Sequence, residues 1–316
     1  MKFKAQDKQN QLIENITVHH LVIGVVIAQE IHVARAVSFR GIALGTPLEF
    51  GNNREGFKLF ERWMQELLKT YQLSSVIVGM EPTGHYWFCL ARWLVTQGIE
   101  TVLVNPHLVK KNKENRDNTP SKSDHKDALV IADMVKNGYY SPVRSHSEVY
   151  EELRILMSNR ETVTKRLNSA VNQIHRWVDI VFPELRQVFK ILTCTSAIAT
   201  LRLFPLPKEI RQLNTDQVIN GWKQYLKRHA GIKRAELLIS LAKSSVGTTQ
   251  ALHAHKLHLG QLLEEYDLAQ LQLEQIELEL NLILKRIPYA QKLLEIRGVN
   301  ATNLAGVLGE AGDLSG

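Results

Sequence analysis

Apolar and polar residues follow two different patterns along the chain, and the change between them falls near residue 147. Before it, several short apolar runs have strand length, and two longer stretches repeat their apolar residues at helical spacing. The predicted strands are 21–27, 31–36, 42–50, 74–80 and 100–104, and the predicted helices are 54–70, 86–97 and 123–136. The order β-β-β-α-β-α-β, with a helix after it, is typical of an α/β domain with a mixed sheet.

Beyond residue 147 the strand pattern disappears and a long amphipathic helix is expected over 147–181, followed by mostly helical sequence to 258. The clearest periodicity comes next, where apolar residues alternate steps of four and three up to Pro288. That heptad seam favours a coiled coil between chains, and the alternative is an internal hairpin with the helix 147–181. The seam is formed by Leu262, Tyr266, Ala269, Leu273, Ile276, Leu280, Ile283 and Ile287.

Composition narrows the class of protein. The 44% apolar content suits a packed globular core, and two widely separated cysteines exclude a disulfide framework and fit a reducing cytosol. No apolar run approaches the roughly 20 residues that span a bilayer, so we expect a cytoplasmic protein without a membrane segment. The net charge of +7 favours an anionic partner such as DNA, although a merely basic soluble protein would show the same charge.

One stretch is polar and basic: KKNKENRDNTPSKS, residues 110–123. It contains no large apolar side chain, and we therefore predict an exposed loop or a disordered segment there. Its cations are the candidate nucleic-acid-binding residues: Lys110, Lys111, Lys113, Arg116 and Lys122.

Three carboxylates lie in positions that suit chemistry, and two of them directly follow this stretch. Glu81 follows a buried strand, where open α/β sheets place functional groups, although a turn residue at a helix start is the simpler interpretation. Asp124 and Asp127 are three residues apart and share one helix face. Alternatively, Ser121 or Ser123 caps that helix, and both acids merely favour its positive end.

A carboxylate pair next to lysines and an arginine can hold Mg²⁺ and a phosphodiester together. Mg²⁺ requires oxygen ligands in near-octahedral geometry, and a pair of metal ions about 3.5–4 Å apart requires three or four carboxylates. Glu81, Asp124 and Asp127 supply three.

Three segments together resemble DEDD-type insertion-sequence transposases, the group related to the Piv DNA invertases: VGMEPTGHYW, VNPHLVKKNKENRDNTPSKSDHKDA and RGVNATNLAGVLGEAGDLSG. The resemblance implies an α/β RNase H-like (RuvC-like) domain over 1–146, a helical, coiled-coil region over 147–288, and the start of a helix-hairpin-helix transposase domain over 289–316. It also implies Mg²⁺-dependent DNA cleavage and joining, often with a structured guide RNA. By motif, the catalytic and metal-binding acids are Glu81, Asp124 and Asp127.

The chain departs from the family pattern at two places. The opening strand of the family usually reads GIDVAKE, whereas this chain reads GVVIAQE, so Val26 takes the place of the first aspartate. The family sequence also continues to a serine beyond the GEAGDLSG region, so we expect a C-terminally truncated domain. We therefore predict a transposase whose catalysis is impaired. The alternative is a non-catalytic nucleic-acid-binding remnant or regulator that pairs with an intact transposase, and a homo-oligomer through the heptad seam is expected in either case.

Overall fold

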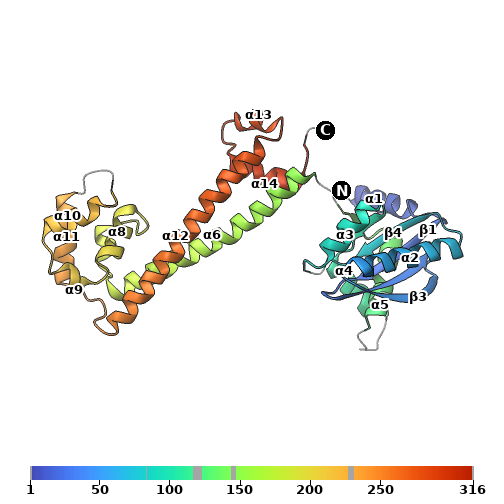
Figure 1. Ribbon diagram of the computed structural model, residues 1–316, viewed down its shortest axis with the longest axis horizontal. Helices are drawn as coiled ribbons and strands as arrows, with labels where there is room; N and C mark the ends of the chain where they lie inside the picture. The colour runs from blue at the N-terminus through green and yellow to red at the C-terminus, as the bar shows by residue number, and fades with distance from the viewer. Residues whose placement is uncertain (1, 83, 117–122, 144–146, 227–230, 315–316) are drawn as a thin grey trace. The chain divides into compact units, whose positions relative to one another are not determined.

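The structure is a computed structural model that describes residues 2–82, 84–116, 123–143, 147–226 and 231–314 (Figure 1). The chain divides into two compact units, Met1–Ser145 and His146–Gly316. The boundary lies beside residue 147, where the strand pattern of the sequence disappears. Within the described ranges, no helix is both long enough and apolar enough to traverse a bilayer.

The first unit is built on a mixed sheet of six strands in the order β3-β2-β1-β4-β5-β6. β1 pairs antiparallel with β2 and parallel with β4, while β5 runs parallel to β4. The mixed α/β sheet predicted from the sequence is thereby confirmed. The strands are β1 (His20–Val26), β2 (Ile31–Ser38), β3 (Ala43–Gly51), β4 (Ser75–Met80), β5 (Glu100–Leu103) and β6 (Ser141–Pro142).

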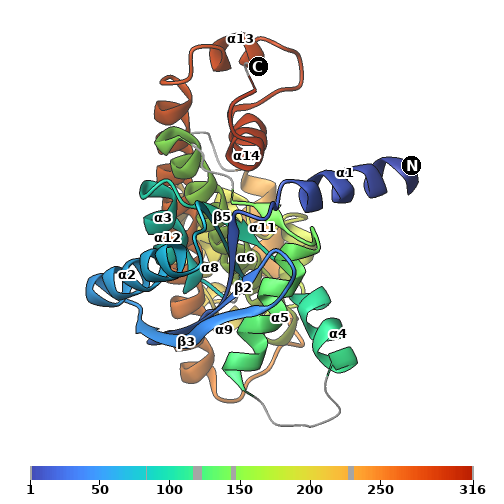
Figure 2. The ribbon, with the colours of Figure 1, turned by 90° about the vertical axis from the view of Figure 1, so that its right-hand side faces the viewer.

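Helices cover both faces of this sheet (Figure 2). On one face, α2 (Arg54–Thr70) and α3 (Trp87–Thr96) pack against the inward side chains of β1 at Leu21, Ile23 and Val25. The intervening residues of β1, Val22 and Val26, belong to the core on the opposite face. The helices on that side are α1 (Lys2–Glu14), α4 (Pro106–Arg116) and α5 (Asp124–Lys136).

A pair of glycines allows α5 to lie directly on the sheet. Gly24 of β1 and Gly79 of β4 are partners in the parallel register, and both lie under α5. A Cβ atom at Gly24 would stand 2.0 Å from the Ala128 carbonyl oxygen, and one at Gly79 would stand 2.2 Å from a methyl carbon of Val135. Any larger residue at either position would therefore push the helix away from the sheet.

The predicted loop over 110–123 is only partly correct. Its first residues continue α4, which ends at Arg116, so the prediction of a loop is wrong for 110–116. The polar composition concealed the helix because its buried contacts come from Leu108 and Val109, before the basic run begins. Residues 117–122 lie outside the described part of the chain.

The second unit is dominated by two long antiparallel helices, α6 (Glu148–Val181) and α12 (Leu252–Leu284) (Figure 1). Contacts along their length fix the direction: Trp177 donates to the backbone oxygen of His255, and Arg160 pairs with Glu277 at 3.1 Å. Shorter helices gather at the two ends. They are α7 (Leu185–Val188), α8 (Thr195–Leu203), α9 (Pro207–Ile210), α10 (Thr215–Lys223) and α11 (Ile232–Lys243) at one end, and α13 (Ala290–Leu294) and α14 (Ala301–Ala311) at the other.

The heptad seam runs along α12 and ends at Ile287, three residues beyond it, and it faces α6 of the same chain. All of its residues are buried except Leu273, which is half-buried, and the cores that contain them also contain residues of α6. The seam therefore forms the internal hairpin, which the sequence left open as the alternative. A homo-oligomer through the same side chains stays a prediction, and it would have to displace α6.

The C-terminal helices belong to the same compact unit as α6 and α12. Gly298 has a φ of +94° in the turn between α13 and α14, and Gly309 brings α14 close to the backbone of Arg154 in α6. The buried face of α14, at Leu304 and Leu308, joins the core around α6 and α12. This arrangement is that of a packed helical turn, and a phosphate-holding role for it stays a prediction.

The internal role of the seam predicts a sharp difference between two neighbouring positions of α12. Ile276 is 6% exposed and Leu278 is 66% exposed. Ile276→Asp buries a carboxylate among apolar side chains and should lower the free energy of unfolding of this unit by at least about 3 kcal/mol. Leu278→Asp, the matched control, should change it by less than about 1 kcal/mol. Urea titration followed by circular dichroism measures both, and equal effects would contradict the internal seam.

Candidate functional site

Position 26 and Glu81 lie side by side at the carboxyl edge of the sheet. The parallel register pairs Val25 of β1 with Met80 of β4, so its next step sets Val26 level with Glu81. Adjacent strands are about 4.8 Å apart, and paired residues of neighbouring strands point to the same face. Val26 belongs to the core under α5. Gly79 lies under α5 and side chains alternate along a strand, so we expect Glu81 to be directed to the same face.

The two aspartates lie in the first turn of α5, which is at the same edge of the sheet. α5 runs opposite to β1, because Ala128 lies over Gly24 in mid-strand while Asp133 lies by Gly41, beyond the far end of β2. Asp127 immediately precedes Ala128, and Asp124 is one helical turn earlier, so the first turn of α5 lies at the carboxyl edge. Ser123 is the N-cap residue, but its side chain makes no capping hydrogen bond.

Exposure differs among the three acids and their neighbours. Asp124 is exposed, whereas Asp127 and Glu81 are half-buried. His125, which lies between the two aspartates in the sequence, pairs with Glu49 of β3 at 3.3 Å. This pair joins the first turn of α5 to β3. Glu49 stands in register with Val33, which in turn is the partner of Val26. Glu49 therefore lies two strands away from Val26 at the same edge of the sheet.

These acids do not form a finished metal site. Among the residues that the structure describes, no three His, Cys, Asp or Glu side chains converge closely enough to hold a metal ion. The position level with Glu81, and directed to the same face, presents the methyl groups of Val26 rather than oxygen ligands. The residues present thus do not fit a complete Mg²⁺ centre, which requires converging oxygen ligands.

The candidate nucleic-acid-binding residues are placed only in part. Lys110 and Lys111 are exposed on α4, which packs beside α5 on the same face of the sheet. For Lys113 and Arg116 the structure describes the backbone of α4 but not the side chains, and Lys122 lies outside the described residues. The structure thus places the side chains of Lys110 and Lys111 alone among these five residues, and a role of the five in binding nucleic acid stays a prediction.

The turn that follows position 26 is fixed by two residues that sequence reasoning missed. The Ala28 N–H donates to Nδ1 of His32 at 3.2 Å. Asn52 donates from its side chain to the Gln29 oxygen and from its backbone to the Glu30 oxygen. No local motif marks these contacts, because Asn52 is more than 20 residues from the turn. Together they hold the end of β1, and hence position 26, in place.

His32 is fully buried in this arrangement, between the rings of Phe50 and Phe57. With Nδ1 accepting a hydrogen bond, the neutral ring carries its proton on Nε2. Burial lowers the pKa of His32 below its usual 6.5, and the neighbouring Asn52 amide opposes that shift in part. The folded protein therefore favours the neutral imidazole.

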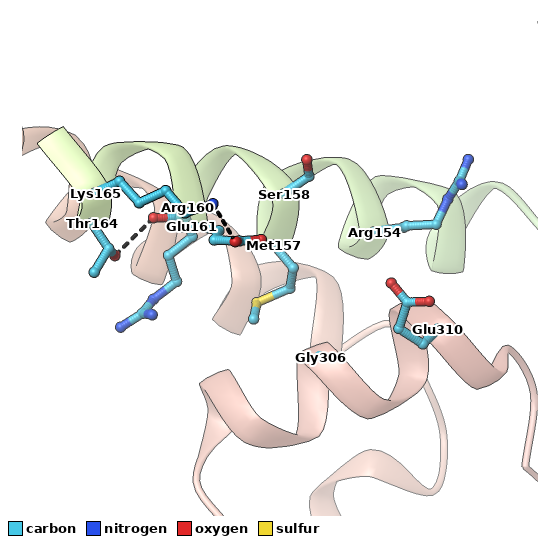
Figure 3. A pocket seen from close by; sticks show the side chains of 9 residues that line it. All are labelled: Arg154, Met157, Ser158, Arg160, Glu161, Thr164, Lys165, Gly306 and Glu310. Carbon is cyan, nitrogen blue, oxygen red and sulfur yellow. Dashed lines mark hydrogen bonds and ion pairs between the residues drawn. The ribbon is translucent and has the colours of Figure 1, made fainter. Parts of the chain in front are cut away.

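The second unit has a groove of about 770 Å³ between α6 and α14 (Figure 3). Its cations are already neutralised by neighbouring acids, since Arg154 pairs with Glu151, Arg160 with Glu277, and Lys165 with Glu161 at 2.6 Å. A phosphate would have to displace these carboxylates, so the groove is a poor anion site. Its lining consists of Arg154, Met157, Ser158, Arg160, Glu161, Thr164, Lys165, Gly306 and Glu310.

Comparisons with known proteins show which family the chain resembles over this region. The model of a DEDD-type family described as "Transposase" matches residues 23–183, which begin in β1 and include all three acids. The pilin gene-inverting proteins of Moraxella bovis and Moraxella lacunata are each 25% identical over 166 residues, which cover 46% of this chain and 49% of theirs. The chain thus spans about half the length of the curated relatives it matches.

The buried neutral His32 predicts a pH-dependent stability. The unfolded chain takes up a proton at this residue near pH 6.5, whereas the folded chain takes it up only at lower pH. The stabilisation is therefore complete above pH 6.5 and is lost as the pH falls below it, by at most about 1.4 kcal/mol per pH unit. Urea titrations between pH 5 and 8 should show a steeper loss for the parent than for His32→Gln, and equal slopes would contradict this account.

Proposed function

The chain belongs to the DEDD transposase family, and from that premise we propose that it binds DNA in transposition or recombination while its own metal-dependent strand cleavage is impaired. The curated relatives are named for inverting a pilin gene, which supports a role in DNA recombination. The impairment is proposed on the basis of a single position, Val26.

Val26 carries the proposal because of where it lies. It is level with Glu81 and directed to the α5 face, above which the helix bearing Asp124 and Asp127 begins. In the resembling family this is the place of the first aspartate, on a rigid strand at the centre of the site. A valine has no lone pair to coordinate a metal ion, and its methyl groups cannot form hydrogen bonds with the water around that ion.

Charge leads to the same conclusion. Two divalent cations bring four positive charges, whereas Glu81, Asp124 and Asp127 bring three negative ones. Glu49 does not replace the missing acid, because it lies two strands away from Val26 and is paired with His125. We therefore expect Mg²⁺ to bind weakly, with DNA cleavage slow or absent.

DNA binding does not require the missing ligand. Lys110 and Lys111 are exposed on the face that carries the acids, and the net charge of the chain is +7. Val26 thus also favours a second candidate function, that of a non-catalytic nucleic-acid-binding regulator that pairs with an intact transposase. A structured guide RNA is a further proposed partner, implied by the family resemblance alone.

The proposed DNA surface is tested by the salt dependence of binding to duplex DNA. Each phosphate contact adds about 0.7–0.9 to the slope of log K against log salt, so Lys110→Gln with Lys111→Gln should lower it by about 1–2. Neutralising Lys113, Arg116 and Lys122 as well should lower it by several units. The matched control is Lys58→Gln with Lys69→Gln, two exposed lysines of α2 on the opposite face of the sheet. An unchanged slope would show that α4 does not contact DNA.

The missing ligand is tested by restoring it. Without metal, Val26→Asp should lower the melting temperature, because it sets a carboxylate beside others in a partly buried strand. With Mg²⁺ near 100 times the dissociation constant, the ion should stabilise the variant by about 2.7 kcal/mol, roughly 5–10 °C. Thermal melts with and without Mg²⁺ measure this difference.

Val26→Asn is the matched control for this experiment, since asparagine has the size and polarity of aspartate without its charge. It should show no larger Mg²⁺-dependent rise than the parent. If Val26→Asp also shows no larger rise, position 26 does not face the three acids and the proposal of a lost ligand is wrong.

A further inference from the structure

Four consecutive ring-bearing residues, His85 to Phe88, lead from the carboxylate edge into α3. They form two close pairs, in which the rings of His85 and Tyr86 and those of Trp87 and Phe88 are each 4.3 Å apart, centroid to centroid. Tyr86 and Trp87 are half-buried and pack against the core under α3. His85 and Phe88 are exposed, Phe88 by 41%. The inner ring of each pair thus anchors an outer ring at the surface.

An arginine lies on the same side of the helix. Arg92 is four residues after Phe88, one turn along α3, and it is exposed. It makes no ion pair and no hydrogen bond with any described residue. α3 contains no carboxylate that could compete for it, so the surface formed by His85, Phe88 and Arg92 is aromatic and positively charged.

This surface begins within a few residues of the proposed site. β4 ends at Met80, Glu81 follows, and α3 starts at Trp87 after a bend in which Gly84 has a φ of +57°. Along the chain, the exposed rings of His85 and Phe88 are therefore four and seven residues after Glu81. Core packing accounts for Tyr86 and Trp87, but it does not account for the exposure of Phe88 and His85.

We propose that His85 and Phe88 stack against an unpaired base of a nucleic-acid strand while Arg92 contacts an adjacent phosphate. This inference rests on the proposed function and specifies the state of its substrate. Aromatic side chains bind bases through their ring faces irrespective of sequence, and a cation beside them neutralises the backbone. In a duplex the ring faces of the bases are covered by their neighbours, so a strand with unstacked bases fits this surface best.

The test measures binding of the full chain to three fluorescent probes of one sequence: single-stranded DNA, single-stranded RNA and duplex DNA. Phe88→Ala should weaken binding of a single-stranded probe by roughly tenfold or more and leave its salt slope unchanged. Arg92→Gln should lower the slope by about one. The single-stranded probe, DNA or RNA, whose affinity falls more in Phe88→Ala is the strand that this surface binds. The affinity of Phe88→Ala for duplex DNA should differ from that of the parent by less than twofold.

Three further variants separate stacking from folding. Phe88→Trp keeps a ring and should bind as the parent does, whereas Phe88→Leu keeps apolar volume without a ring and should match Phe88→Ala. The control is Tyr139→Ala, because Tyr139 is another exposed aromatic residue of this unit and follows the C-terminal end of α5. This variant should bind the single-stranded probes as the parent does. Melting temperatures identify any variant that fails to fold.

The possible failures are distinguishable. If the chain binds duplex DNA with a steep salt dependence, but Phe88→Ala and Phe88→Leu leave single-strand affinity within twofold of the parent, stacking is wrong and the proposed function stands. If no probe binds at low salt, both are wrong.

Discussion

The contact between α5 and the glycine pair of the sheet is the constraint on which the rest of the first unit depends. Gly24 and Gly79 are neighbours on adjacent parallel strands, and neither leaves room for a Cβ atom under the helix. Because the helix is seated there, its first turn must emerge at the carboxyl edge of β1 and β4. The first turn of α5, with Asp124 and Asp127, therefore lies at the edge of the sheet from which Glu81 follows β4, although more than 40 residues separate these acids in the chain.

The position of α5 on the sheet also determines where the side chain of Val26 is directed. A strand residue two positions beyond Gly24 is necessarily directed to the α5 face at the carboxyl edge, and that residue is Val26. Around it the supporting structure is intact: the following turn is held by His32 and Asn52, and α5 is tied to β3 through His125 and Glu49. These contacts surround the position that we propose as the place of a lost ligand.

The sequence predicts most helices and strands correctly, but it does not predict which elements pack against one another. The helix predicted over 54–70 agrees with α2 because apolar residues repeat at helical spacing along its length. The helix over 106–116 was missed because every residue after Val109 is charged or an asparagine. The heptad seam of α12 identified a buried face, but periodicity does not say whether the occupant is α6 or a second chain.

For the candidate site, motifs predict Glu81, Asp124 and Asp127, and this stays a prediction; the strand register adds that Val26 stands level with Glu81. The hydrogen bonds of His32 and Asn52 leave no local signal, since they join residues that are distant in sequence or lie inside an ordinary strand pattern. The aromatic residues after Glu81 are visible in the sequence. Their division into buried and exposed rings requires the structure.

The claim that position 26 is the lost ligand position can be examined directly by anomalous diffraction from crystals grown with Mn²⁺, a close substitute for Mg²⁺ in oxygen-ligand sites. For Val26→Asp we predict a manganese peak bonded to the introduced carboxylate and to at least one of Glu81, Asp124 and Asp127, with a far weaker peak in the parent. An introduced carboxylate directed toward α2 and α3, or a manganese ion bound equally well by the parent, would contradict the account.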